Sequence, residues 1–231
     1  ALETVPKLKM SSLNPQAIEF MEREIVLASE RHTGRSTFPR EMEGQPVGAY
    51  LLITLDSDSE DQLYTLLEQA AELVLDAGAM DVLVADSPAK MRDAWAARSA
   101  FLEVIMEECD VVVPVTKIAS YLEFVNKTGE ECGLVIRSFG HAGDGNLHIY
   151  ECSNDLTEEE FKKRVDKFFD LIYKEASAQG GLVSGEHGIG SGKIQYLVES
   201  IGETNMALME GIKRVFDPKM ILNPGKVCYR L

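Results

Sequence analysis

Histidine, tryptophan and paired cysteines are scarce in this chain of 231 residues. It contains four histidines, one tryptophan and four cysteines. No two cysteines form a CxxC pair, which excludes a thiolate zinc knuckle and a dithiol redox motif. We therefore expect reduced, mostly structural thiols in a cytoplasmic protein. The cysteines are Cys109, Cys132, Cys152 and Cys228.

Basic side chains are also in short supply. Lysine and arginine number 23 against 38 aspartates and glutamates, which gives a net charge of −15. Such a charge repels phosphate backbones and anionic lipid surfaces, so we expect no nucleic-acid partner. No apolar run is long enough to cross a bilayer, and nothing after Ala1 resembles a signal peptide. The sequence therefore predicts a protein with no transmembrane segment and no leader.

The remaining composition is that of a globular protein, with 45% hydrophobic residues. Apolar residues at helical spacing predict helices over 15–31, 63–77, 88–108, 117–131 and from Thr157 onward, where Glu160 completes a capping box. Short β-compatible runs predict strands over 47–55, 80–85, 111–114, 134–139 and 146–152. Their order predicts an α+β fold in which ferredoxin-like halves share one antiparallel sheet covered by helices. We expect residues 1–231 to form a single domain.

Two polar clusters hold three of the four histidines. The first, SFGHAGDGNLH, covers residues 138–148, and the second, GEHGIG, covers residues 185–190. A hairpin in the first cluster can bring His141 and His148 to one point, and Glu186 offers a carboxylate from a separate loop. Two imidazoles and a carboxylate are good ligands for zinc, iron or manganese. They also leave coordination positions open, as a metal that takes part in a reaction requires.

Three further residues could act on a ligand at this point. His187 should point away from the same ion, because consecutive side chains diverge on an extended backbone, and it could instead remove a proton. Asn146 lies two positions from His148 on the same strand face and could hydrogen-bond a substrate. Arg98, in the stretch WAAR, could clamp a carboxylate, although such a residue is more often a solvated helical charge.

Simpler interpretations stay open for both clusters. The first could be a tight hairpin whose glycines serve only backbone geometry, and the second could be a loop that leads into a helix. A P-loop is excluded, because His187 stands where its first glycine is required and Ile194 stands where Ser or Thr is required. Neither cluster has the GxGxxG spacing of a dinucleotide-binding fold.

Three motifs in order resemble a known family. They are SFGHAGDGNLH, the later GEHGIGSGK of residues 185–193 and the ILNPGK of residues 221–226. Together they resemble the carboxy-terminal domain of FAD-linked oxidases of the vanillyl-alcohol-oxidase type. That group includes D-lactate dehydrogenases, the flavin subunit of glycolate oxidase and D-2-hydroxyglutarate dehydrogenases. The likeness runs from the WxxR helix near residue 95 and the DVVVP strand to the end of the chain.

The resemblance implies a division of labour between two domains. FAD would be held mainly by an amino-terminal domain absent from this chain, so the chain alone would show no turnover. His141, His148 and Glu186 would bind a divalent metal, which polarises the hydroxyl and carboxylate of a 2-hydroxy acid. The remaining roles implied are His187 as the base, Arg98 and Asn146 as substrate-binding residues, and Asn223 near the flavin.

The substrate expected from the resemblance is D-lactate or glycolate. Some relatives carry a basic residue just before the DVVVP-like strand to grip a second carboxylate, whereas this chain has Glu108 and Cys109 there. By analogy an electron-transfer flavoprotein or an iron-sulfur subunit would accept the electrons. A metal-dependent hydrolase and a non-enzymatic ferredoxin-like ligand-binding module are the alternatives left open by the residues alone.

Overall fold

A computed structural model describes residues 1–101, 109–152 and 156–228. The strands are β1 (Ala17–Glu22), β2 (Glu41–Met42), β3 (Gln45–Pro46), β4 (Ala49–Thr54), β5 (Cys109–Val112), β6 (Val135–His141) and β7 (Asn146–Cys152). The helices are α1 (Val5–Met10), α2 (Arg23–Thr33), α3 (Glu60–Asp76), α4 (Pro88–Ser99), α5 (Ile118–Cys132), α6 (Glu158–Ala178) and α7 (Ile194–Phe216). Short 3₁₀ turns lie at Leu2–Thr4, Val115–Lys117 and Ala142–Asp144.

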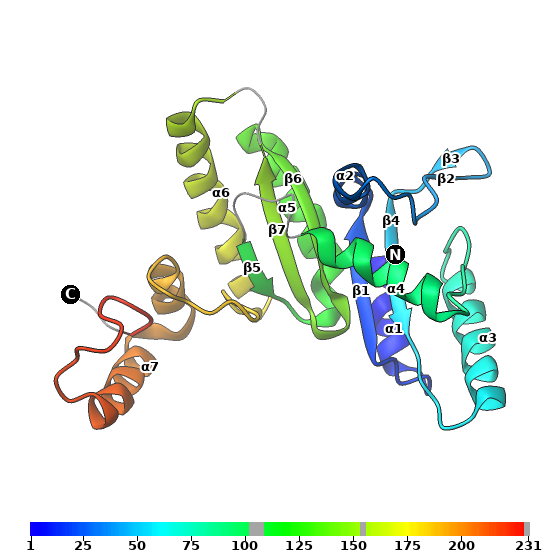
Figure 1. Cartoon of the computed structure of the whole chain (residues 1–231). Coiled ribbons are helices and arrows are strands. Elements are labelled where there is room, and N and C mark those ends of the chain that lie inside the picture. The colour runs from blue at the N-terminus through cyan, green and yellow to red at the C-terminus, as the bar shows by residue number, and fades with distance from the viewer. Residues whose placement is uncertain (102–108, 153–155, 229–231) are drawn as a thin grey trace.

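The main sheet has five strands in the order β4-β1-β6-β7-β5. All four neighbouring pairs are antiparallel. β5 and β6 therefore run parallel on either side of β7, with α5 connecting them in a split β-α-β arrangement. The prediction of an α+β fold with one shared antiparallel sheet is confirmed, and Figure 1 shows the sheet at the centre of the molecule, α3 at one end and α7 at the other.

The two faces of the sheet are buried in different ways. One face packs against α1, α5 and α6 in the larger apolar cluster, to which Phe20, Leu147 and Ile149 belong. The opposite face carries a smaller cluster in which Met21 and Phe139 pack against α2. Because side chains alternate along a strand, the residues between the large-core positions all point to this second face. That face is where polar side chains collect.

Several local signals act as predicted. The capping box between Thr157 and Glu160 opens α6. Gly133 ends α5 in the left-handed conformation, with φ of 66°, which glycine adopts without the penalty of a side chain. The strands predicted over 47–55, 111–114, 134–139 and 146–152 correspond to β4, β5, β6 and β7. The four cysteines form no disulfide.

The helix predicted over 15–31 is wrong in its first half. Asn14 has a φ of 46°, which stops a helix from starting there, and residues 17–22 form β1. This strand hydrogen-bonds β4 on one side and β6 on the other, so the ladder outweighs the local helical pattern. Only the second half of the predicted helix exists, as α2, which ends at the left-handed Gly34.

Two other predicted elements differ from the structure. Residues 80–85 form no strand, and Met80, Leu83 and Val84 are exposed, with no strand paired to them among the residues that the structure describes. The helix predicted over 88–108 is α4 as far as Ser99; Ala100 and Phe101 follow it and are buried, and residues 102–108, with Glu108, fall outside the described ranges. In the part of the chain that the structure describes, no helix is long and apolar enough to span a bilayer.

Candidate functional site

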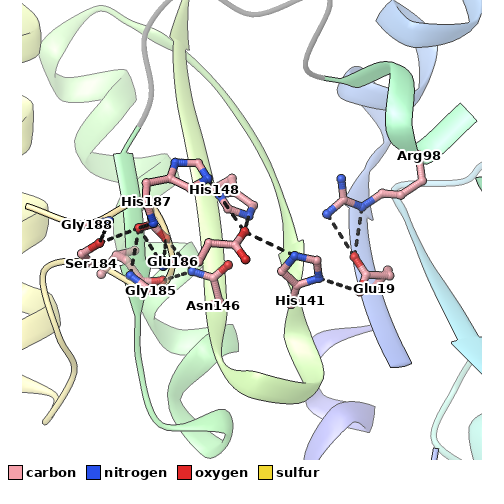
Figure 2. Close-up of polar contacts among 12 residues, drawn as sticks. Glu19, Arg98, His141, Asn146, His148, Ser184, Gly185, Glu186, His187 and Gly188 are labelled. Atoms are coloured by element: carbon pink, nitrogen blue, oxygen red, sulfur yellow. Dashed lines mark hydrogen bonds and ion pairs between the residues drawn. The ribbon is translucent and has the colours of Figure 1, made fainter. Parts of the chain in front are cut away.

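Three predicted ligands meet at one point on the second face of the sheet. His141 ends β6, His148 lies in the middle of β7, and Glu186 comes from the loop between α6 and α7. One ligand atom from each residue lies within 4.8 Å of the other two. The Glu186 Oε1 atom is 3.4 Å from His141 Nε2 and 3.0 Å from His148 Nε2 (Figure 2).

The two distances from Glu186 are close to those expected for ligands that share one metal ion. Two ligand atoms that each lie about 2.1 Å from one ion at a tetrahedral angle are about 3.4 Å apart. Glu186 thus lies at a suitable distance from both imidazoles without a change of fold. The His148 side chain is almost completely buried, whereas half of Glu186 is exposed, so the remaining coordination positions would face solvent or a ligand. The donor set suits zinc, iron or manganese.

His141 is oriented by a buried carboxylate that sequence reasoning missed. Its Nδ1 atom lies 2.7 Å from Glu19 Oε1 on β1, directly opposite in the strand register. The hydrogen bond to Glu19 raises the pKa of His141, against the opposing effect of burial. Burial alone would raise the pKa of Glu19, but the contacts with His141 and Arg98 outweigh it and lower that pKa.

Arg98 reaches the same carboxylate from α4. Its Nε and Nη2 atoms both lie 3.0 Å from Glu19 Oε2, and the guanidinium sits 4.3 Å from the centre of the Phe139 ring. Only 8% of Arg98 is exposed, so its interpretation as a solvated helical charge is wrong. Stacking on an aromatic ring and pairing with a carboxylate hold a guanidinium in a defined orientation.

Asp110 on β5 organises the loop that carries Glu186 and His187. Its Oδ2 atom accepts hydrogen bonds from the backbone amides of Gly185, Glu186 and His187, at 2.9, 3.1 and 2.9 Å. The Ser184 hydroxyl adds a fourth at 2.8 Å. Burial by itself raises the pKa of Asp110, but these hydrogen bonds hold it at about 2. The carboxylate therefore stays ionised and fixes the loop onto the sheet.

Asn146 is also held by Asp110. Its Nδ2 atom donates to Asp110 Oδ1 at 2.6 Å, which settles the orientation of the amide because a carboxylate only accepts. The Oδ1 atom of Asn146 is buried and has no hydrogen-bond partner among the described residues. Asn146 and His148 lie on the same strand face, so this unsatisfied acceptor is on the side of the sheet that carries the histidines.

His187 lies closer to the other histidines than expected. Its ring stacks on that of His148, with centroids 5.0 Å apart and an angle of 22° between the planes. Its Nε2 atom is 3.8 Å from Glu186 Oε1, so the side chains of residues 186 and 187 do not diverge as on an extended strand. The loop bends here, and 39% of the His187 side chain is exposed.

Asn223 lies apart from this cluster. It is exposed, with a φ of 45°, in the segment that follows α7. Asp217 shapes that segment by accepting hydrogen bonds from the amides of Ile221 and Leu222. Figure 1 places the segment at the α7 end of the molecule. The structure thus brings together every predicted site residue except Asn223.

Sequence reasoning missed Glu19 and Asp110 for a shared reason. Each is a single carboxylate inside an apolar run, in the stretches AIEFM and CDVVV. Both side chains are buried, with 3% of Glu19 and 0% of Asp110 exposed. Because a buried carboxylate is costly unless it is paired, each must have a partner. An isolated acid within a buried strand was the signal that could have found both.

Comparisons with known proteins agree with this architecture. Residues 1–227 match the family described as FAD linked oxidases, C-terminal domain. The D-lactate dehydrogenase of Anaerostipes hadrus is 56% identical over 236 residues, which cover 100% of this chain and 50% of that protein. The glycolate oxidase subunit GlcD of Bacillus subtilis is 28% identical, over 98% of this chain and 48% of its own length.

Solved structures show the same fold. The crystal structure of p-cresol methylhydroxylase with substrate bound superposes with a TM-score of 0.67 at 15% identity, over 99% of this chain and 49% of that one. The chain spans about half the length of the curated relatives it matches. It belongs to the family of FAD linked oxidases, as their C-terminal domain.

Proposed function

We propose that residues 1–231 are the substrate domain of an FAD-dependent dehydrogenase of 2-hydroxy acids, with D-lactate as the first candidate and glycolate as the second. The observation that carries the proposal is the convergence of His141, His148 and Glu186 beside a buried arginine. The 56% identity to a D-lactate dehydrogenase supports the choice of substrate. A preceding domain would hold most of the FAD.

The charges around the site support a bound cation. With neutral imidazoles, Glu19, Asp110 and Glu186 contribute three negative charges, and Arg98 and Lys193 contribute two positive charges. A divalent ion changes this balance from net negative to net positive. An anionic substrate would therefore bind in its presence, even on a chain with a net charge of −15.

In the proposed reaction, a divalent cation and FAD have one set of roles and the residues of this chain have another. A divalent cation held by His141, His148 and Glu186 would polarise the substrate hydroxyl and carboxylate, and FAD would accept the hydride. Arg98 would bind the substrate carboxylate through N–H donors beyond the two that contact Glu19.

Asn146 and His187 would act on the substrate hydroxyl. The buried Oδ1 of Asn146 would accept its proton in a hydrogen bond and so orient it. His187 would then take that proton as the hydride leaves carbon 2. The bond from the His187 amide to Asp110 fixes the backbone of this base while its ring stays accessible. We propose that Asn223 lies near the flavin, as the family resemblance implies.

The surface near Arg98 suits contact with a second domain. Trp95 lies one helical turn before Arg98 on α4 and is 39% exposed, so part of a large apolar ring faces solvent. We propose that the FAD-binding domain covers it. A cytoplasmic location, and an electron-transfer flavoprotein or iron-sulfur subunit as electron acceptor, remain part of the proposal.

The proposal is tested on the full-length protein. Its flavin should be reduced anaerobically by D-lactate or glycolate and not by L-lactate, and a chelator should abolish the reduction until zinc, iron or manganese is restored. A flavin that none of these 2-hydroxy acids reduces, with each metal supplied, would overturn the proposal. Hydrolysis of an ester that needs the metal but no flavin would favour a metal-dependent hydrolase instead.

The role of His187 is tested separately. A His187→Asn enzyme should reduce its flavin about 100- to 10,000-fold more slowly, the usual contribution of a general base. The control is His32→Asn, since His32 is an exposed residue of α2 and should leave the rate unchanged. An unchanged rate in the His187 variant would remove it as the base.

A further inference from the structure

Building on the proposed function, we propose that Glu19 is a positioning residue, which holds the metal ligand His141 and the carboxylate-binding Arg98 at a fixed separation and so selects acids with the hydroxyl on carbon 2. Its two oxygens serve different partners. Oε1 lies 2.7 Å from His141 Nδ1, and Oε2 lies 3.0 Å from both Nε and Nη2 of Arg98 (Figure 2).

The fold alone does not call for a carboxylate at this position. Glu19 is 3% exposed and lies in the second strand of the sheet, between Ile18 and Phe20 of the main core. Removing a charge from water is costly, and an apolar residue of similar volume often replaces a buried ion pair without loss of stability. The carboxylate is therefore better explained by what it does to its two partners.

For His141, Glu19 determines which nitrogen faces the metal site. A carboxylate only accepts hydrogen bonds, so the neutral imidazole must carry its proton on Nδ1. The lone pair then lies on Nε2, the atom that is 3.4 Å from Glu186 Oε1. Outer carboxylates of this kind orient a histidine ligand and raise its basicity toward a metal.

For Arg98, Glu19 immobilises one edge of the guanidinium. The ring of Phe139 supports its face at 4.3 Å, and Phe139 itself is only 1% exposed. The guanidinium has five N–H donors, and the contacts with Glu19 use those on one side. The other donors can bind a substrate carboxylate in an orientation that is set before the substrate arrives.

The separation of the two sites follows from this sharing. His141 and Arg98 bind opposite oxygens of one carboxylate, which itself is fixed in a strand between two others. A 2-hydroxy acid has its hydroxyl on the carbon next to the carboxylate, so both groups can be held at once. An acid with the hydroxyl on carbon 3 places these groups farther apart and cannot fit both anchors as well.

The experiment compares Glu19→Gln with Glu22→Gln in the full-length enzyme. Glu22 ends the same strand, but its carboxylate accepts hydrogen bonds from Asn126 and from the Ser138 amide, on the other face of the sheet from the proposed metal ligands. Chelated protein is titrated with Co²⁺ alone and followed by its absorption spectrum. The turnover of D-lactate and of 3-hydroxypropionate is then measured with metal in excess.

Glu19→Gln should weaken Co²⁺ binding by about 10- to 100-fold, the usual effect of losing an outer carboxylate. It should also raise the KM for D-lactate more than it changes kcat. The ratio of kcat/KM for D-lactate to kcat/KM for 3-hydroxypropionate should therefore fall. Glu22→Gln should change none of these. A folded Glu19→Gln enzyme that binds Co²⁺ as tightly as the unmodified one overturns the proposal, as does an unchanged preference between the two acids.

Two further results separate this proposal from the proposed function. If the enzyme oxidises no 2-hydroxy acid, the proposed function fails, and Co²⁺ affinity alone still decides whether Glu19 positions His141. If Glu19→Gln does not fold, ¹⁵N NMR of the histidine rings in chelated, unmodified protein is decisive. At a pH where the His141 ring is neutral, a proton on Nδ1 supports the proposal, and a proton on Nε2 overturns it.

Discussion

Replacing Asp110 with asparagine should release the loop that carries Glu186 and His187. Asparagine has the shape of aspartate but no charge, and only one of its two terminal atoms accepts hydrogen bonds. The remaining oxygen can keep the loop amides bound only if the new NH₂ group faces Asn146. The amide of Asn146 must then turn round to accept from it, and it would present NH₂ instead of Oδ1 to the substrate.

The magnitude follows from the pKa of Asp110. The site lowers it from the usual 3.8 to about 2, which corresponds to about 2 kcal/mol in favour of the ionised form in the folded protein. Because the folded pKa is the lower one, this stabilisation is complete above about pH 4 and disappears as the pH falls through about 2. At pH 7 the variant should lose all of it. Asn146 and Lys193 contribute to this stabilisation besides the loop, so its loss makes opening of the loop at most about 30-fold more frequent.

Hydrogen–deuterium exchange at pH 7 measures this opening directly. The amides of residues 185–187 donate to Asp110, so the peptide that contains them should exchange faster in Asp110→Asn, by a factor of at most about 30. Asp217→Asn is the matched control, because Asp217 holds the amides of Ile221 and Leu222 in the same way. Each variant should affect its own segment only. Equal exchange of the 185–187 peptide in Asp110→Asn and in the unmodified protein would refute the anchoring argument.

Two more predictions concern the same site. Gly185→Ala should abolish turnover in the full-length enzyme, because the new methyl group would clash with the Asn146 amide and with Asp110, whereas Gly192→Ala, which has open space around it, should be neutral. Adding Zn²⁺ to chelated protein at about 1,000 times its Kd should stabilise the folded state by about 4 kcal/mol and raise the thermal midpoint. His148→Ala should remove that increase, and a midpoint that zinc raises equally in the variant would contradict the ligand assignment.

The sequence predicted the centre of the site better than its surroundings. His141 and His148 flank a glycine-rich turn, so their approach follows from a hairpin, which is a local structure. The contribution of Glu186 could be inferred because its carboxylate complements two imidazoles chemically. Glu19 could not be found in this way, since its partners His141 and Arg98 lie 122 and 79 residues away along the chain.

The same distinction explains the errors in the fold. The stretch that forms β1 has apolar residues at spacings that a helix also allows, and its identity as a strand depends on pairing with β6, more than 100 residues later. Residues 80–85 have the composition of a strand, but within the described ranges no strand pairs with them and they are not part of the sheet. Helices with local signals, such as the capping box of α6, were predicted correctly.

The register of the sheet explains why the site forms at all. Glu19 is opposite His141, Phe139 is opposite His148, and His148 is opposite Asp110. Directly paired residues share a face, and so do residues two apart on one strand, so all five side chains point to the same side of the sheet. Four neighbouring strands thus contribute to one row.

The alignment of these side chains depends on the register between β1 and β6. A shift of β1 by one residue against β6 would turn Glu19 to the opposite face and put Phe20 or Ile18 of the main core in its place. The hydrophobic core on the opposite face thus keeps Glu19 in register with His141. Stability and function are coupled here through strand register, and substitutions of Ile18 or Phe20 should disturb metal binding although neither side chain lies on the face of the site.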